Sequence, residues 1–134
     1  MGAERRQVVI TGIGVITPLG NSLPELWAAV RQGRSAIRRL TRFEPEGFRS
    51  QLAAEVPAFD VTDYVDARQA RRLDRFSAFA VAAANLAVRD AGIPLHASCL
   101  CQGAVAVGSA LGGVAFAEEQ HARYQQSGLR AVEP

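Results

Sequence analysis

The chain has 134 residues, of which 49% are hydrophobic, and a formal net charge of +2 at pH 7. This length suffices for one compact domain, or part of one, and is too short for several. No apolar run approaches the roughly 20 residues that cross a bilayer, and the first apolar run is too short for a signal peptide. We therefore expect a cytoplasmic protein without a membrane span.

All fifteen basic residues are arginine, so no lysine chemistry is available within this chain. The two cysteines, Cys99 and Cys101, lie one residue apart. They make no disulfide framework and offer too few nearby ligands for structural zinc. This usage fits a reducing compartment, and no metal site is predicted.

The first predicted elements are a strand and a helix. Residues 8–11 (VVIT) form a continuous apolar run, typical of a strand buried on both faces in a parallel sheet. Ser22 and Glu25 have the spacing of a capping box, in which the hydroxyl and the carboxylate each satisfy a free backbone N–H. Gly33 stands where a C-terminal cap belongs, so we expect a helix over about 23–32.

The middle of the chain combines an irregular stretch with a long helix. Residues 34–66 lack periodicity and contain prolines, so we expect irregular chain with a short strand near 52–56. A helix is predicted over about 67–91, because apolar residues recur at helical spacing until Gly92. The apolar stripe consists of Leu73, Phe76, Ala80, Ala83, Ala87 and Ala91. Because this stripe is mostly alanine, another backbone can approach it closely, and we expect the helix deep in the fold.

The last predicted elements are a second buried strand at 104–107 (AVAV) and a helix over about 114–126. The glycine-rich run 108–113 turns the chain between them, and Gly128 closes the helix. Strands that alternate with helices imply an α/β fold with parallel strands.

The pair Gly12 and Gly14 after the first strand invites comparison with a dinucleotide-binding loop. The third glycine of that fingerprint would fall on Thr17, and Pro18 follows it. No acidic residue about 20 positions further on ends a second clear strand. We therefore interpret these glycines as a structural turn.

Three segments in chain order carry a family resemblance. They are residues 8–21 (VVITGIGVITPLGN), 71–93 (RRLDRFSAFAVAAANLAVRDAGI) and 104–113 (AVAVGSALGG). Together they resemble the N-terminal part of β-ketoacyl-acyl-carrier-protein synthases, the condensing enzymes of fatty-acid and polyketide biosynthesis, which have a thiolase-like fold. The resemblance implies that residues 1–134 are an incomplete N-terminal ketosynthase domain of α/β class, with parallel strands alternating with helices.

The activity that the resemblance implies is a decarboxylative Claisen condensation. A cysteine thiolate takes an acyl group from the phosphopantetheine of acyl carrier protein, and malonyl carrier protein loses carbon dioxide to give the attacking enolate. Histidines and backbone N–H groups stabilise the developing charge. In the family these groups lie later in the sequence. We therefore expect no catalytic residue in this chain, no cofactor beyond the carrier's phosphopantetheine, and no activity of the chain alone.

Cys99, Cys101, His96 and His121 are the remaining candidates for chemistry. An activated cysteine needs a helix N-terminus or a cationic neighbour to lower its pKa, which the predicted pattern does not supply. Neither histidine has a cysteine or carboxylate at a spacing that indicates a partner. We interpret all four as structural residues.

Four arginines at i, i+3, i+4 and i+7 share one face at the start of the long predicted helix. They are Arg68, Arg71, Arg72 and Arg75. Positive charge at a helix N-terminus opposes the macrodipole, so another benefit is expected. The alternatives are a solvated face or ion pairs with Asp63, Asp66 or Asp74. Nucleic acid is disfavoured because there is no wider basic excess and no aromatic interleaving.

The family resemblance gives these arginines a role. Ketosynthases bind the acidic recognition helix of the carrier protein through basic residues at this helix start. Arg68, Arg71 and Arg72 match those positions, and Arg130 resembles another such site. The resemblance therefore implies an acyl carrier protein as partner.

Leu111 matches a family position that lines the acyl pocket near the dimer interface, although plain core packing fits the sequence equally well. The family also implies a homodimer or a heterodimer with a ketosynthase-like subunit. Three interpretations of function stay open: the N-terminal portion of a catalytic synthase, a non-catalytic partner of the chain-length-factor type, and a truncated interaction module. The residue at the nucleophile position distinguishes the first two.

Overall fold

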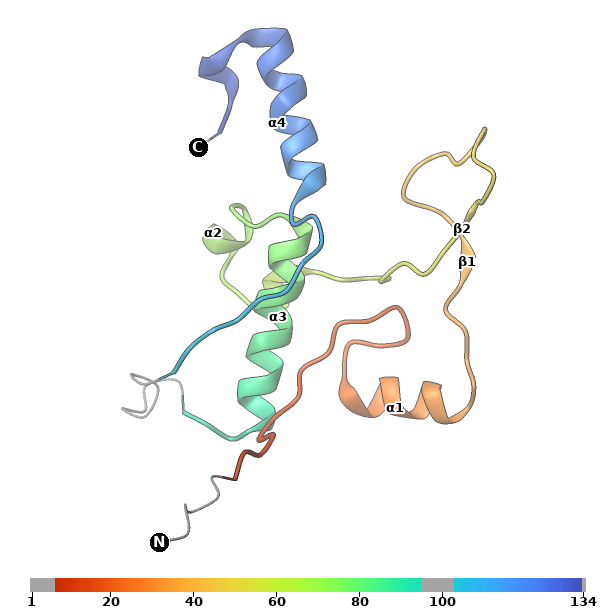
Figure 1. Ribbon diagram of the computed structural model, residues 1–134, viewed down its shortest axis with the longest axis vertical. Helices are drawn as coiled ribbons and strands as arrows, with labels where there is room; N and C mark the ends of the chain where they lie inside the picture. The colour runs from red at the N-terminus through yellow and green to blue at the C-terminus, as the bar shows by residue number, and fades with distance from the viewer. Residues whose placement is uncertain (1–6, 95–102, 134) are drawn as a thin grey trace, which may run out of the picture. The chain divides into compact units, whose positions relative to one another are not determined.

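A computed structural model describes residues 7–94 and 103–133 of the chain (Figure 1). The elements in chain order are α1 (Leu23–Arg31), β1 (Arg38–Arg39), β2 (Leu52–Ala53), η1 (Val61–Asp63), α2 (Ala67–Ala70), α3 (Arg75–Asp90), α4 (Val114–Ser127) and η3 (Leu129–Ala131). The chain divides into two compact units, the first formed by Met1–Phe59 with Ala83–Cys101 and the second by Asp60–Ala82 with Gln102–Pro134.

Helix α1 of the first unit begins and ends where its caps predict. The N–H of Glu25 donates to Ser22 Oγ over 3.4 Å, and the Glu25 carboxylate accepts the N–H of Asn21 over 3.0 Å. At the other end Gly33 has a φ of 63°, and its N–H donates to a carbonyl of the last turn over 3.0 Å. Glycine adopts this left-handed conformation without the cost a Cβ would add. The prediction of this helix is confirmed.

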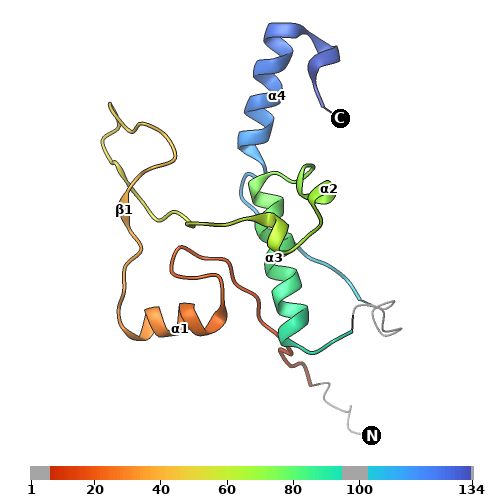
Figure 2. The ribbon, with the colours of Figure 1, turned by 180° about the vertical axis from the view of Figure 1, so that it is seen from behind.

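From α1 an extended segment leads into a small sheet, as the view from behind shows (Figure 2). Strands β1 and β2 pair antiparallel, with Arg38 opposite Ala53 and Arg39 opposite Leu52. The N–H of Leu40, just after β1, extends the pairing by donating to the carbonyl oxygen of Gln51, just before β2, over 2.9 Å. The short strand expected near 52–56 is therefore present in part. Its partner was not predicted, because a pair of arginines shows no alternation of apolar and polar residues.

The two apolar runs predicted as buried parallel strands do not form strands in the described part of the chain. Val8 is 89% exposed and Val105 is 92% exposed, and neither run pairs with another strand. Apolar runs of this kind are stable as strands only when hydrogen-bonded neighbours and covering layers satisfy both the backbone and the side chains. Among residues 7–94 and 103–133, β1 and β2 are the only paired strands.

The residues after the first apolar run pack tightly on α3 within the first unit. A Cβ added to Gly14 would meet the backbone of Ala83 and Ala87, and one added to Gly12 would meet that of Ala87 and Ala91. The N–H of Ile13, between the glycines, donates to an α3 carboxylate over 2.9 Å. The prediction that the alanine stripe admits a close backbone is confirmed, and the glycines act in packing.

The long helix predicted over 67–91 is wrong at its start, because the chain forms two helices. Asp66 Oδ1 accepts the N–H groups of Arg68 and Gln69 and caps α2, over 2.9 and 2.8 Å. Asp74 Oδ1 accepts the N–H of Ser77 over 2.8 Å at the start of α3. Each aspartate satisfies donors that a helix leaves free at its first turn, so each begins a helix of its own.

Helix α3 ends as predicted, and so does α4. Gly92 follows α3 with a φ of 65°, and its N–H donates to a carbonyl of the last turn over 3.1 Å. Gly128 ends α4 and leads into η3. Among the described residues, the buried hydrophobic side chains are the small ones of Ala29, Ala78 and Ala82. None of the helices in this part of the chain is long and apolar enough to cross a membrane.

Candidate functional site

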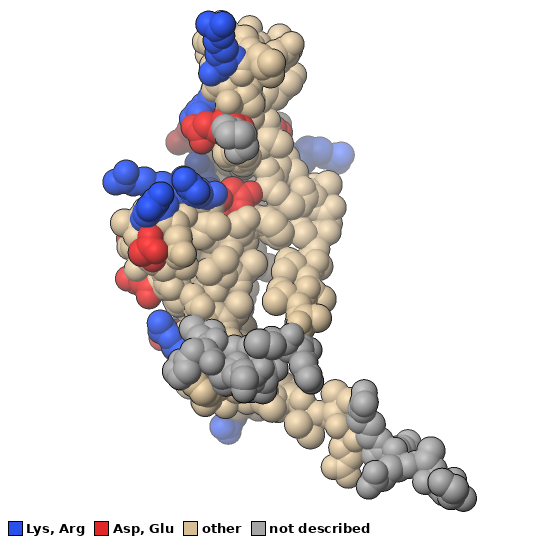
Figure 3. Space-filling view, turned by 90° about the vertical axis from the view of Figure 1, so that its left-hand side faces the viewer, with Lys and Arg blue, Asp and Glu red and all other residues tan. Residues whose placement is uncertain are grey.

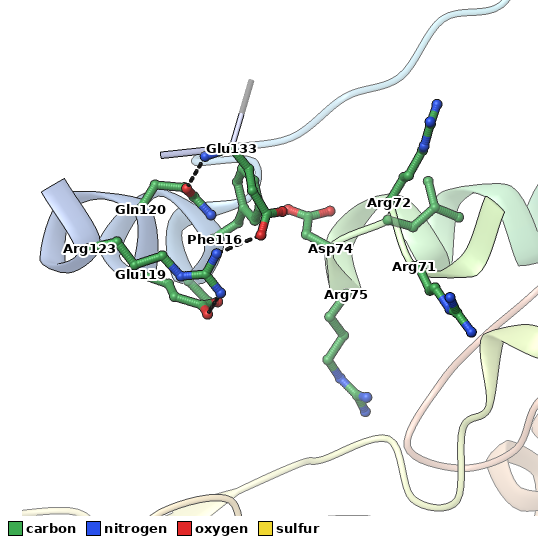
Figure 4. Close-up of a pocket in the computed structure, with 11 residues that line it drawn as sticks. Arg71, Arg72, Asp74, Arg75, Phe116, Glu119, Gln120, Arg123 and Glu133 are labelled. Atoms are coloured by element: carbon green, nitrogen blue, oxygen red, sulfur yellow. Dashed lines mark hydrogen bonds and ion pairs between the residues drawn. The ribbon is translucent and has the colours of Figure 1, made fainter. Parts of the chain in front are cut away.

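A cleft of about 740 Å³ lies in the second unit, between residues 71–75 and one face of α4. We call it the arginine cleft. Figure 4 shows Gln120, Arg123 and Glu133 on one side of it, and Arg71 and Arg72 on the other. Its volume falls within the roughly 300–1,000 Å³ typical of ligand sites.

One side of the arginine cleft is held by a pair of ion pairs. Arg123 on α4 binds Glu119 and Glu133, each over 2.6 Å. The hydrogen bond to Glu133, and then the one to Glu119, raise the pKa of Arg123 above its usual value. All three side chains are at least 40% exposed. Water therefore screens these pairs, and they orient the side chains more than they stabilise the fold.

Gln120 is the buried polar residue of the cleft, with only 8% of its surface exposed. Its Oε1 accepts the N–H of Glu133 over 2.8 Å. Its Nε2 is buried without a hydrogen-bond partner among the described residues. A buried amide donor left in this way costs about 1–3 kcal/mol. Gln120 therefore holds an unsatisfied amide donor in the wall of the cleft.

The predicted carrier-binding arginines separate into two groups. Arg71 and Arg72 line the arginine cleft, are exposed, and form no ion pair in the part of the chain that the structure describes. Arg68 on α2 and Arg130 in η3 are exposed as well, but they do not line it. Figure 3 shows basic side chains gathered on the face where α2 lies, with acidic side chains beside them.

The predicted single helical face of four arginines is wrong, because α2 ends before α3 begins. Arg71 is the C-cap of α2, while Arg75 is the first residue of α3 and places its guanidinium 4.7 Å from the ring centre of Phe79. Nor do the nearby aspartates pair with the exposed arginines: Asp66 and Asp74 use their carboxylates as helix caps. The alternative of ion pairs with these aspartates is not observed among the described residues.

Leu111 lies at a second hollow of the same unit, a groove of about 450 Å³ that Val114, Ala117 and His121 also line. Its side chain is 80% exposed, so it does not pack in a core. His121 is exposed on α4, with Nε2 3.4 Å from the side-chain nitrogen of Gln125. The groove is lined by apolar side chains together with the polar ones of Glu118 and His121.

Sequence reasoning missed the polar side of the arginine cleft. The spacing of Glu119 and Arg123, four residues apart on a helix, was a usable signal for their ion pair. The burial of Gln120 had no such signal, because it depends on the fold of 128–133 back toward α4. His96, Cys99 and Cys101 lie outside the described residues. Within 7–94 and 103–133 no group of three acidic, His or Cys side chains could hold a metal ion.

The sequence matches a family model described as "Beta-ketoacyl synthase, N-terminal domain" over residues 5–133. It is 37% identical over 131 residues to a 3-oxoacyl-acyl-carrier-protein synthase 2 of Coxiella burnetii, covering 98% of this chain and 32% of that protein. A protein of the same name from Synechocystis sp. is 37% identical over 117 residues, covering 87% of this chain and 28% of that protein. The chain thus spans about a third of the length of these relatives.

Two solved structures are also similar. The ishigamide ketosynthase/chain length factor aligns with a TM-score of 0.75 and 33% identity, covering 98% of this chain and 33% of that one. A beta-ketoacyl synthase from Burkholderia phymatum aligns with a TM-score of 0.63 and 31% identity, covering 90% of this chain and 30% of that one. These likenesses confirm the predicted α/β class, the N-terminal part of a thiolase-like fold.

Proposed function

The chain belongs to the beta-ketoacyl synthase family, to whose N-terminal domain it corresponds, and from this premise we propose that it works as the N-terminal portion of a 3-oxoacyl-acyl-carrier-protein synthase. Such an enzyme is a cytoplasmic acyltransferase of fatty-acid or polyketide biosynthesis. In its condensation the malonyl thioester loses carbon dioxide, the resulting carbon forms a bond to the acyl carbonyl, and the enzyme's thiolate leaves. The products are a β-ketoacyl thioester and carbon dioxide.

The contribution we assign to this chain is the docking of acyl carrier protein. The observation that carries this assignment is the pair Arg71 and Arg72, whose exposed guanidinium groups have no ion-pair partner in the described part of the chain. Exposed, unpaired cations steer an acidic partner and can pair with its carboxylates. Arg68 on α2 and Arg130 in η3, both exposed, are proposed as further contacts for the carrier protein. Substrates arrive on the carrier's phosphopantetheine, and no further cofactor is proposed.

Leu111 is proposed to contact the acyl chain. It combines a branched apolar side chain with 80% exposure and a place at an apolar groove. Burial of such a side chain against an alkyl chain is favourable by about 1.5–3 kcal/mol. We also propose a dimer, either of two copies or with a ketosynthase-like subunit.

A second function is favoured by one specific observation, the TM-score of 0.75 to a ketosynthase/chain length factor. In this alternative the protein is a non-catalytic partner of a condensing subunit. Both alternatives share the basic surface and the dimer. They differ at the nucleophile position, where the catalytic subunit has cysteine.

Charge reversal tests the docking surface. We expect the protein with Arg68, Arg71 and Arg72 all changed to Glu to bind purified acyl carrier protein at least tenfold more weakly at low salt, measured by surface plasmon resonance. The difference should shrink above 0.5 M salt, where screening acts within a few ångströms. The control Arg49→Glu reverses an exposed arginine of the first unit. Equal affinity of the triple variant and the control would refute the assignment.

The catalytic centre is tested separately. We expect the purified 134-residue chain to resist covalent labelling by an acyl-thioester mimic and to leave malonyl carrier protein undecarboxylated. Release of labelled carbon dioxide by the chain alone would show that it carries a centre of its own.

A further inference from the structure

The orientation of the Gln120 amide is set by a single hydrogen bond. Because the backbone N–H of Glu133 is a donor, the atom that receives it must be the oxygen, as the 2.8 Å contact to Oε1 records. The other end of the amide is therefore the nitrogen, and it remains without a partner among the described residues. The nitrogen of an amide donates only, so the group it lacks is an acceptor oxygen.

The surroundings of Gln120 narrow the kind of molecule that could bring this oxygen. Three carboxylates line the arginine cleft, on Asp74, Glu119 and Glu133. They oppose a polyanion such as nucleic acid or a polyphosphate. The ring of Phe116, on the same helix face, offers an apolar wall that is 41% exposed. Such a wall does not suit a small inorganic ion.

The opposite side of the cleft favours a negatively charged group on the ligand. Arg71 and Arg72 lie across from Gln120 (Figure 4) and form no ion pair in the part of the chain that the structure describes. Arg123, by contrast, is neutralised by its two glutamates. The cleft therefore combines a donor, an apolar wall and a free positive charge. One ligand class supplies all three complements: a peptide with main-chain carbonyls, an apolar side chain and a carboxylate.

We propose that the arginine cleft binds an extended peptide segment of a partner protein that carries an acidic residue. A main-chain carbonyl of the segment accepts from Gln120 Nε2, an apolar side chain lies on Phe116, and the carboxylate pairs with Arg71 or Arg72. The proposal shares two arginines with the docking surface for acyl carrier protein but does not depend on that function. It adds Gln120 and Phe116 and assigns no role to Arg68.

The test selects peptides from a phage-displayed library of random octapeptides against the immobilised protein. We expect enrichment of sequences that contain Asp or Glu next to an apolar residue. An enriched peptide, labelled with fluorescein, is then titrated with the protein by fluorescence polarisation. Its Glu→Gln or Asp→Asn version should bind about tenfold more weakly, and this difference should vanish in the double variant Arg71→Gln, Arg72→Gln.

Gln120 is tested by two variants. Gln120→Leu removes the donor and keeps the approximate size of the side chain, and we expect it to weaken peptide binding about fivefold or more. Gln120→Glu keeps an acceptor for the N–H of Glu133 but replaces the donor by a second oxygen, and we expect a larger loss. If circular dichroism shows that Gln120→Leu does not fold, Gln120→Glu is the variant that decides.

Arg68→Gln separates this proposal from the proposed function. We expect Arg68→Gln to weaken the binding of acyl carrier protein and to leave the affinity for the peptide unchanged, because Arg68 does not line the cleft. If no sequence is enriched over the Gln120→Glu protein, or if enriched peptides bind both Gln120 variants as tightly as the original, the peptide site is overturned. Carrier binding would be untouched by that result.

Discussion

In the first unit two glycines bring the backbone of residues 12–14 against α3, whereas in the second unit long charged side chains line an open cleft. The first contact leaves no room for a side chain and holds one polar interaction, from Ile13 to Asp90 over 2.9 Å. The arginine cleft of the second unit encloses about 740 Å³ and has in its wall a buried amide nitrogen without a partner among the described residues. The closely packed glycine contact therefore serves to hold the fold together, whereas the arginine cleft has room and polar groups for binding.

The largest loss of stability is expected when the space at the glycine contact on α3 is filled. Gly14→Ala forces a methyl group against the backbone of Ala83 and Ala87, which cannot yield as a side-chain tip can. We expect a loss of about 1–3 kcal/mol in the free energy of unfolding, measured by urea denaturation. Gly108→Ala is the matched control, because a Cβ there meets nothing within 4 Å. A Gly14→Ala protein as stable as the control would show that the contact is loose.

In the arginine cleft the largest stability effect should come from Asp74, which is also a cap. Asp74→Ala removes the acceptor for the N–H of Ser77. We expect it to cost about 1 kcal/mol, within the range of about 0.5–2 known for such caps, by thermal unfolding. Asp74→Asn keeps a side-chain oxygen and should cost clearly less. If both changes cost the same, the carboxylate's charge, and not the cap, would be its contribution.

A smaller effect is expected from Arg123, although it forms two ion pairs. Because its partners are mostly solvent-exposed, Arg123→Gln should shift the urea midpoint only slightly, and less in 0.5 M salt than at low salt. The effect should stay well below that of Gly14→Ala. If Arg123→Gln lowered the free energy of unfolding as much as Gly14→Ala, the ion pairs of the cleft would contribute as much to stability as the glycine contact.

The smallest effect concerns pH and belongs to Glu55 beside the paired strands. The Thr41 hydroxyl, followed by the backbone N–H groups of Thr41 and Arg42, lowers the pKa of Glu55 below its usual 4.5. A lowered pKa in the folded state stabilises above the unfolded pKa, and this stability is lost as the pH falls through the folded value. Glu55→Gln should therefore be less stable at pH 7 and lose less on acidification below pH 4.5. Parallel pH profiles would contradict the assignment.

Predictions from sequence succeeded where a few neighbouring residues decide the outcome. Ser22 with Glu25 begins α1, and Gly33 and Gly92 end their helices, because capping satisfies backbone groups within one turn. The break between α2 and α3 was within reach of the same reasoning, since Asp66 and Asp74 are both good N-cap residues. The continuous apolar spacing across residues 73–91 concealed it.

The order of residues alone was enough to predict both ends of α1, the C-terminal ends of α3 and α4, a turn at Gly12 and Gly14, and the family. Tertiary structure alone decided whether the apolar runs at 8–11 and 104–107 would pair, which arginines share a cleft, and that Gln120 would be buried. The physical reason is range. Caps and glycine turns act within a few residues, whereas strand pairing and burial depend on which distant segments come together.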